Sequence, residues 1–171
     1  FPERSRILFS MNRLSPGTRA QILTLLCEGM SMRAISRVVD VSINTVTKLL
    51  IDAGEACVAY HDDNVHGVTA KRIQVDEIWS FNYAKAKNVA KAKAAPDFAG
   101  DVWTWTAIDA ETKIIPCWYV GERDGQAAYH FMHDLAGRLA HRVQLTTDGH
   151  KPYLGAVEDA FGGEIDYAQL V

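Results

Sequence analysis

The chain has 171 residues, of which 48% are hydrophobic and 23% are charged, an ordinary globular composition. No apolar run approaches the length of a membrane span, and residues 1–10 lack the apolar segment of a signal peptide. Three widely spaced cysteines without a C-x-x-C pair argue against structural zinc and suit buried thiols, so we expect a cytoplasmic protein.

The net charge of −3 hides a strong separation of charge along the chain. Residues 1–51 carry seven Lys/Arg against three Asp/Glu, and residues 71–96 carry six against two. Residues 97–171 carry five against twelve. Two basic segments beside an acidic one predict local contact with DNA next to a cation site.

The N-terminal part predicts three short helices. Phe1 is not a natural start, so Met11 is the expected initiator. Apolar spacing predicts a helix over residues 18–29, a second over 32–39 capped by Ser31, and a third over 43–53 closed by Gly54. Asp40 replaces the usual turn glycine, and aspartate tolerates the left-handed backbone region that such a turn requires.

This pattern predicts a helix-turn-helix domain over residues 11–57. In the third helix we expect Val46, Leu49 and Leu50 to pack inward. The outward side chains suit base edges and phosphates in a major groove: Asn44, Thr45, Thr47 and Lys48. The alternative is a plain three-helix bundle with a solvated polar face.

Residues 58–70 show little periodicity and are predicted to be a linker. Residues 72–81 then read as a strand, with Ile73, Val75, Trp79 and Phe81 on the face expected to meet a core. Asp76 lies on the opposite face. A carboxylate in such a strand is costly to desolvate unless something compensates it.

Four lysines and no acid occupy residues 83–95. The segment is either a solvated loop or short helix, or one that grips a nucleic-acid backbone, with Lys85 and Lys87 as contacts. A hairpin follows over residues 101–120, and its tryptophans are expected to be core or edge packing rather than base-stacking platforms.

The remaining pattern is a helix over residues 125–140, a strand over 143–148 ending in Asp148, a helix over 151–161 and a final strand. The order is therefore three strands in a meander, followed by strands added in parallel through helical crossovers. His130 and His133 have a metal-compatible spacing, but no carboxylate or cysteine pattern supports a site there.

These motifs together resemble the catalytic domain of DDE transposases, in particular those of small bacterial insertion sequences. The resemblance covers residues 71–171 and rests on Asp76-Glu77-Ile78-Trp79-Ser80-Phe81, Asp109 near a hairpin, Gly121-Glu122-Arg123, and Thr147-Asp148 followed by Tyr153. It implies an α/β fold: the helix-turn-helix followed by a ribonuclease-H-like mixed sheet with flanking helices, incomplete at the C-terminus. In that fold the first and fourth strands are neighbours, which would place Asp76 beside Asp148.

The resemblance also implies the chemistry. Asp76 and Asp148 would bind Mg²⁺ or Mn²⁺ and catalyse DNA strand cleavage and strand transfer, in a homo-oligomer assembled on insertion-sequence and target DNA in a bacterial cytoplasm. The family's third carboxylate lies on a helix after the fifth strand, beyond the end of this sequence. Glu158 and Glu164 fall in other elements, so no third ligand is assigned, and the fragment is expected to be inactive alone.

Two other functions stay open. A helix-turn-helix transcriptional regulator predicts no metal dependence. A ribonuclease-H-like nuclease predicts Mg²⁺-dependent cutting without joining.

Overall fold

The computed structural model describes residues 14–170. Residues 11–13 of the predicted helix-turn-helix domain, Met11 among them, lie outside this range. Residue 171 of the predicted catalytic domain also lies outside it. The chain divides into two compact units, with the boundary after Asp62.

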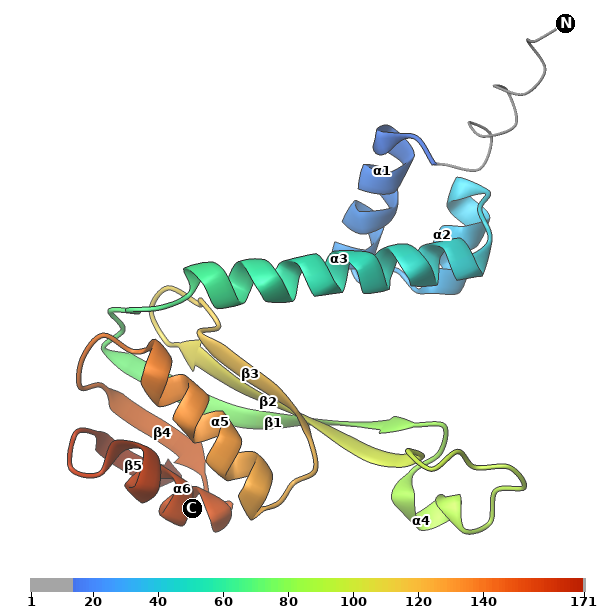
Figure 1. Cartoon of the computed structure of the whole chain (residues 1–171). Coiled ribbons are helices and arrows are strands. Elements are labelled where there is room, and N and C mark those ends of the chain that lie inside the picture. Colours follow the sequence, from blue (N-terminus) through green and yellow to red (C-terminus); the bar gives the residue numbers. More distant parts are fainter. Residues whose placement is uncertain (1–13, 171) are drawn as a thin grey trace, which may run out of the picture. The chain divides into compact units, whose positions relative to one another are not determined.

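The described part of the N-terminal unit contains three helices: α1 (Pro16–Cys27), α2 (Met32–Val39) and α3 (Ile43–Asn64) (Figure 1). Ser15 and Ser31 cap α1 and α2 by accepting hydrogen bonds from the backbone N–H of Thr18 and Ala34. Asp40 takes the predicted left-handed conformation, with φ of 55°. The helices pack around a small core of Ile22, Ile35, Val46 and Leu49.

The third helix is much longer than predicted. It passes through Gly54 and ends only at Asn64, so the predicted linker at residues 58–70 is wrong for its first half. A glycine inside a helix costs only about 1 kcal/mol relative to alanine, which the good helix formers around it can offset. The prediction that Leu50 packs inward is also wrong, because its side chain is 41% exposed.

The C-terminal unit is built on one mixed sheet. Its elements are β1 (Arg72–Asn82), α4 (Ala86–Val89), β2 (Gly100–Asp109), β3 (Cys117–Gly121), α5 (Gly125–Arg138), β4 (Gln144–Asp148), α6 (Pro152–Phe161) and β5 (Asp166–Leu170). The strand order is β3-β2-β1-β4-β5. The first three strands pair antiparallel, and β4 and β5 add in parallel. The predicted α/β class, meander and parallel additions are confirmed.

Helices α5 and α6 pack against each other and cover one face of the sheet (Figure 1). The core between them and the sheet contains, among others, Ile73, Val75, Trp105, Phe131, Leu145 and Tyr153. On the other face the side chains of β1, such as Gln74, Asp76 and Ile78, are exposed. Alternation along β1 therefore separates a buried face from an exposed one, as predicted for its first half.

The second half of β1 departs from the prediction. Trp79 and Phe81 were expected to face a core, but they are 40% and 48% exposed. The cause is the length of the strand: β4 pairs with β1 only from Arg72 to Gln74, whereas β2 pairs with it as far as Asn82. Past the ends of β3 and β4, the strands β1 and β2 continue as a two-stranded arm that carries α4 (Figure 1).

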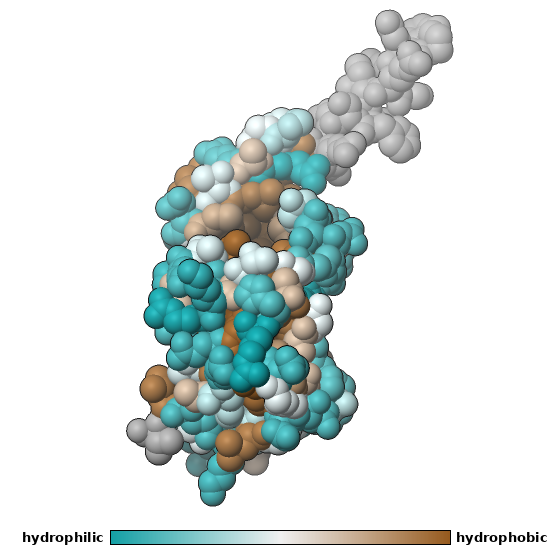
Figure 2. Space-filling model, turned by 90° about the vertical axis from the view of Figure 1, so that its left-hand side faces the viewer, coloured by the Kyte–Doolittle hydropathy of each residue, from teal (hydrophilic) through white to brown (hydrophobic). Residues whose placement is uncertain are grey.

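Hydrophilic residues dominate the face shown in Figure 2, with apolar residues in separate patches. Among residues 14–170, no helix combines the length and apolar character needed to cross a membrane. The prediction of no membrane span agrees with this finding.

A candidate metal centre where two parallel strands separate

The predicted site residues lie where β1 and β4 part. The last paired residues are Gln74 and Thr146, and Asp76 and Asp148 each follow two residues later on their strands. In open α/β sheets, ligands bind in the crevice beyond the carboxyl ends of parallel strands. Both aspartates therefore stand at a position in the sheet that favours a binding site.

Three carboxylates come together there. One oxygen from each of Asp76, Glu77 and Asp148 lies within 4.8 Å of the others. The predicted adjacency of Asp76 and Asp148 is thus confirmed, whereas their role as metal ligands stays a prediction. Exposure differs within the cluster: Asp76 is exposed, Asp148 has 43% of its side chain exposed, and Glu77 only 1%.

Backbone N–H groups orient the two exposed carboxylates. Asp76 Oδ1 accepts from the N–H of Glu77 at 2.8 Å, and Asp148 Oδ1 accepts from the N–H of His150 at 2.9 Å. The second oxygen of Asp76 accepts no hydrogen bond from the described residues. Asp76 therefore offers an oxygen to a ligand without giving up an existing contact.

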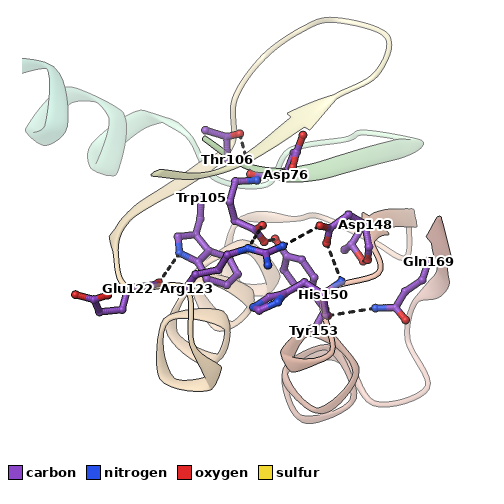
Figure 3. Close-up of polar contacts among 11 residues, drawn as sticks. Asp76, Trp105, Thr106, Glu122, Arg123, Asp148, His150, Tyr153 and Gln169 are labelled. Atoms are coloured by element: carbon purple, nitrogen blue, oxygen red, sulfur yellow. Dashed lines mark hydrogen bonds and ion pairs between the residues drawn. The ribbon is translucent and has the colours of Figure 1, made fainter. Parts of the chain in front are cut away.

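Arg123 links the other two carboxylates. Its Nε donates to Glu77 Oε2 and its Nη2 to Asp148 Oδ2, both at 2.9 Å, and Figure 3 shows its side chain reaching Asp148. The Trp105 indole N–H donates to the carbonyl of Glu122 at 3.0 Å, which fixes the backbone just before Arg123. The guanidinium supplies the positive charge that a carboxylate as buried as Glu77 requires.

Tyr153 and His150 complete the buried side of the cluster. The Tyr153 hydroxyl donates to Glu77 Oε1, and burial, followed by this contact, raises the pKa of Tyr153 far above its usual value. Burial lowers the pKa of His150, with a further contribution from Arg123. The Nε2 atom of His150 is buried and has no hydrogen-bond partner among residues 14–170.

The donor set fits a hard divalent cation. Mg²⁺ and Mn²⁺ prefer carboxylate oxygens, and Asp76 and Asp148 present such oxygens at a solvent-accessible position. The three carboxylates outnumber the single guanidinium that contacts them, so the cluster keeps a net negative charge that favours a further cation. Glu77 is only 1% exposed and both of its oxygens are engaged by side chains, Arg123 and Tyr153, whereas Asp148 is 43% exposed, so Glu77 is assigned to positioning rather than to direct ligation.

The predicted DNA contacts lie elsewhere. Asn44 and Lys48 are exposed on α3, while Thr45 and Thr47 are half-buried. Lys48 forms an ion pair of 2.8 Å with Asp52 one turn along the helix. Lys85 and Lys87 are exposed on the arm.

Sequence reasoning assigned no role to Glu77, Arg123, Tyr153 or His150. Strand parity sets Glu77 on the face opposite Asp76, and only the separation of β1 from β4 lets both reach one cluster. Arg123 and Tyr153 belong to the motifs of the resemblance, which was the signal available for them. His150, two residues after Asp148, carried no pattern of its own.

No known protein-family model matches this chain, and no curated protein matches it significantly. Its function has to be inferred from the residues and their geometry.

Proposed function

We propose that this chain is a DDE-type transposase-like protein, which binds insertion-sequence DNA and catalyses metal-dependent strand cleavage and strand transfer. The observation that supports this proposal most directly is that carboxylate oxygens of Asp76, Glu77 and Asp148 lie within 4.8 Å of one another, at the point where two parallel strands separate. The strand order β3-β2-β1-β4-β5, with α5 and α6 as crossovers, supports a ribonuclease-H-like assignment.

Phosphodiester cleavage needs an activated water and a stabilised leaving oxygen, and carboxylate-bound divalent ions supply both. In the proposal Asp76 and Asp148 hold these ions. Glu77 keeps Arg123 and Tyr153 in place, and Arg123 in turn orients Asp148. A DNA 3′-hydroxyl released by cleavage then attacks the target strand, so no protein nucleophile is needed.

The N-terminal unit supports the DNA-binding part of the proposal. The left-handed turn at Asp40 and the capped α2 support a helix-turn-helix, in which the start of α3 would be the recognition helix. Asn44 and Lys48 are exposed on that helix, where an amide can read a base edge and an ammonium can contact a phosphate. Assembly as a homo-oligomer on DNA belongs to the same proposal.

Thermal unfolding of the full chain tests metal binding. An ion bound only by the folded state, at a hundredfold excess over its Kd, stabilises it by about 2.7 kcal/mol, or roughly 5–10 °C for a chain of this size. We expect Mn²⁺ to raise Tm, and Asp76→Asn or Asp148→Asn to abolish the rise. Asp159→Asn removes an exposed aspartate on α6 and is the matched control. An unchanged response in both cluster variants would refute the site.

Reaction products separate the proposal from its alternatives. In a chain lengthened at its C-terminus by a helix that carries a third carboxylate, Mn²⁺-dependent nicking of supercoiled plasmid and joining of a 3′-hydroxyl oligonucleotide to it should both occur and both require Asp76. Nicking without joining would indicate a nuclease. Duplex binding with neither reaction and no metal response would indicate a transcriptional regulator.

A further inference from the structure

The arm beyond the sheet carries exposed aromatic rings. We define the arm as residues 78–103: the second half of β1, α4 and the start of β2. Trp79 and Phe81 lie on the same side of β1 with ring centroids 5.8 Å apart. The ammonium of Lys85 lies 4.9 Å from the centre of the Trp79 ring. Both aromatic residues remain largely accessible to solvent, at 40% and 48% exposed.

The rings form a row that begins at the carboxylate cluster. Trp79 follows Glu77 by two residues on β1, and Trp103 is its direct partner on β2. The guanidinium of Arg123, which binds Glu77 and Asp148, lies 5.2 Å from the Trp103 ring. Beside the carboxylates the surface therefore presents Arg123 over Trp103, then Trp79 with Lys85 next to Trp103 on the neighbouring strand, and Phe81 further along β1.

The same arm is basic. Lys85, Lys87, Lys91 and Lys93 are all exposed, and within the described residues none of them pairs with a carboxylate. Lysine is depleted at the centres of protein–protein interfaces, so this composition argues against a second protein chain as the occupant. Exposed rings among unpaired cations are the combination that binds single-stranded nucleic acid, because bases stack on the rings and phosphates meet the charges.

We propose that the arm binds an unpaired DNA strand leading away from the cleavage site, with Trp79 and Phe81 as stacking platforms. The centroids of the two rings lie 5.8 Å apart, well beyond the roughly 3.4 Å base spacing of a duplex strand, so bases placed on the two rings would not stack directly on each other. The inference rests on the proposed function only for the identity of the nucleic acid as DNA.

Fluorescence anisotropy of the full chain with a labelled single-stranded oligonucleotide, in the absence of divalent metal, tests this. Trp79→Ala should weaken binding by roughly 5- to 150-fold, the equivalent of about 1–3 kcal/mol per stacked base. Trp79→Phe keeps a stacking face and should retain most of the affinity. Trp118→Ala is the matched control, because Trp118 is also 40% exposed but lies on β3, away from the row. Duplex binding should not change in any of the three.

Several outcomes would overturn the proposal. Equal affinities for the wild type and Trp79→Ala would do so, as would a loss in Trp118→Ala of the same size. A lower sedimentation coefficient of Trp79→Ala with unchanged DNA affinity would show that the row joins two copies of this chain. Tighter binding of an RNA of the same sequence would assign the arm to RNA. Failure of metal-dependent nicking in the lengthened chain would refute the proposed function without altering these affinities.

Discussion

The contacts of Arg123 explain how three acidic side chains can share one small volume. Glu77 is nearly inaccessible to water, whereas Asp148 is close to half exposed, and the guanidinium spans both. Its planar fork suits two carboxylates at once, which an ammonium cannot reproduce. Arg123 therefore helps to hold the three carboxylates in their arrangement.

Arg123→Gln should lower the free energy of unfolding by about 2–3 kcal/mol, because a buried carboxylate loses its charged donor. Arg123→Lys should cost less, since charge is kept and only the two-pronged geometry is lost. Arg72→Gln breaks an exposed pair of 3.7 Å with Glu111 and should cost under about 0.5 kcal/mol. Urea titrations of the three variants provide the comparison, and equal costs would contradict a bridging role for Arg123.

The three cysteines should differ in reactivity. Cys117 is buried, and burial, together with its contact to Asp134, raises its pKa far above the usual value, so it stays a thiol at neutral pH. Cys27 and Cys57 are exposed. A thiol-specific reagent should therefore modify two cysteines in the native protein and three after denaturation, as counted by mass spectrometry. Rapid native labelling of Cys117 would show that its surroundings open readily.

At the scale of elements, the sequence pattern predicted those features that depend on interactions between residues close in the sequence. Caps, turn residues and alternation gave the order of strands and helices and the inward face of Ile73 and Val75. Pattern failed where the outcome depended on distant partners. The exposure of Trp79 depends on where β4 stops pairing, and the place of Glu77 in the cluster depends on the gap that this leaves. Gly54 is a different case: a glycine often ends a helix, but here the helix formers on both sides of it continue α3 to Asn64.

Gly54 makes α3 open to stabilisation. It lies inside the helix, and a Cβ added there meets no atom within 4 Å. Gly54→Ala should raise the free energy of unfolding of this unit by about 0.5–1 kcal/mol. Gly29→Ala should have the opposite effect, by about 1–2 kcal/mol, because Gly29 has a φ of 75°. Thermal melts followed by circular dichroism measure both, and stabilisation by Gly29→Ala would contradict the reasoning.

The turn between β2 and β3 should be sensitive to acid. Asp109 accepts hydrogen bonds from the Thr112 hydroxyl and the Glu111 N–H, which lower its pKa. A lowered folded-state pKa stabilises the protein above the unfolded value of about 3.9 and loses that effect as pH falls through the folded value. Asp109→Asn should therefore be destabilising at pH 7 and progressively less so below about pH 4. Urea midpoints across this range test it, and a pH-independent difference would exclude the carboxylate as the cause.

At the scale of the molecule, basic charge is divided between the two units. The start of α3 and the arm carry the exposed cations proposed to contact DNA, and the carboxylate cluster belongs to the unit that bears the arm. Binding of duplex DNA and chemistry on a strand are thus assigned to different surfaces. Substitutions in the N-terminal unit should therefore change duplex binding and leave the strand chemistry unchanged, and substitutions in the C-terminal unit should do the reverse.

Lys48 tests this division. Lys48→Ala should weaken duplex binding on all sequences and reduce the slope of log K against log salt by about 0.9, while leaving the Mn²⁺ response of Tm intact. Asp52→Ala removes the carboxylate paired with Lys48 and should strengthen binding. Anisotropy titrations at several salt concentrations decide between these outcomes, and an unchanged slope for Lys48→Ala would remove that lysine from the DNA contacts.

β1 runs without a break from Asp76 to Phe81. An insertion or deletion in this stretch would therefore change the position of the aromatic side chains relative to the carboxylates. One inserted residue between Glu77 and Trp79 would turn Trp79 to the opposite side of the strand, and two would carry it about 7 Å further from the carboxylates. The tip of the arm around residues 90–96 has no such restriction, since it lies outside the paired strands. Natural variants of this protein should therefore gain and lose residues at the tip, and keep a constant number between Asp76 and Phe81.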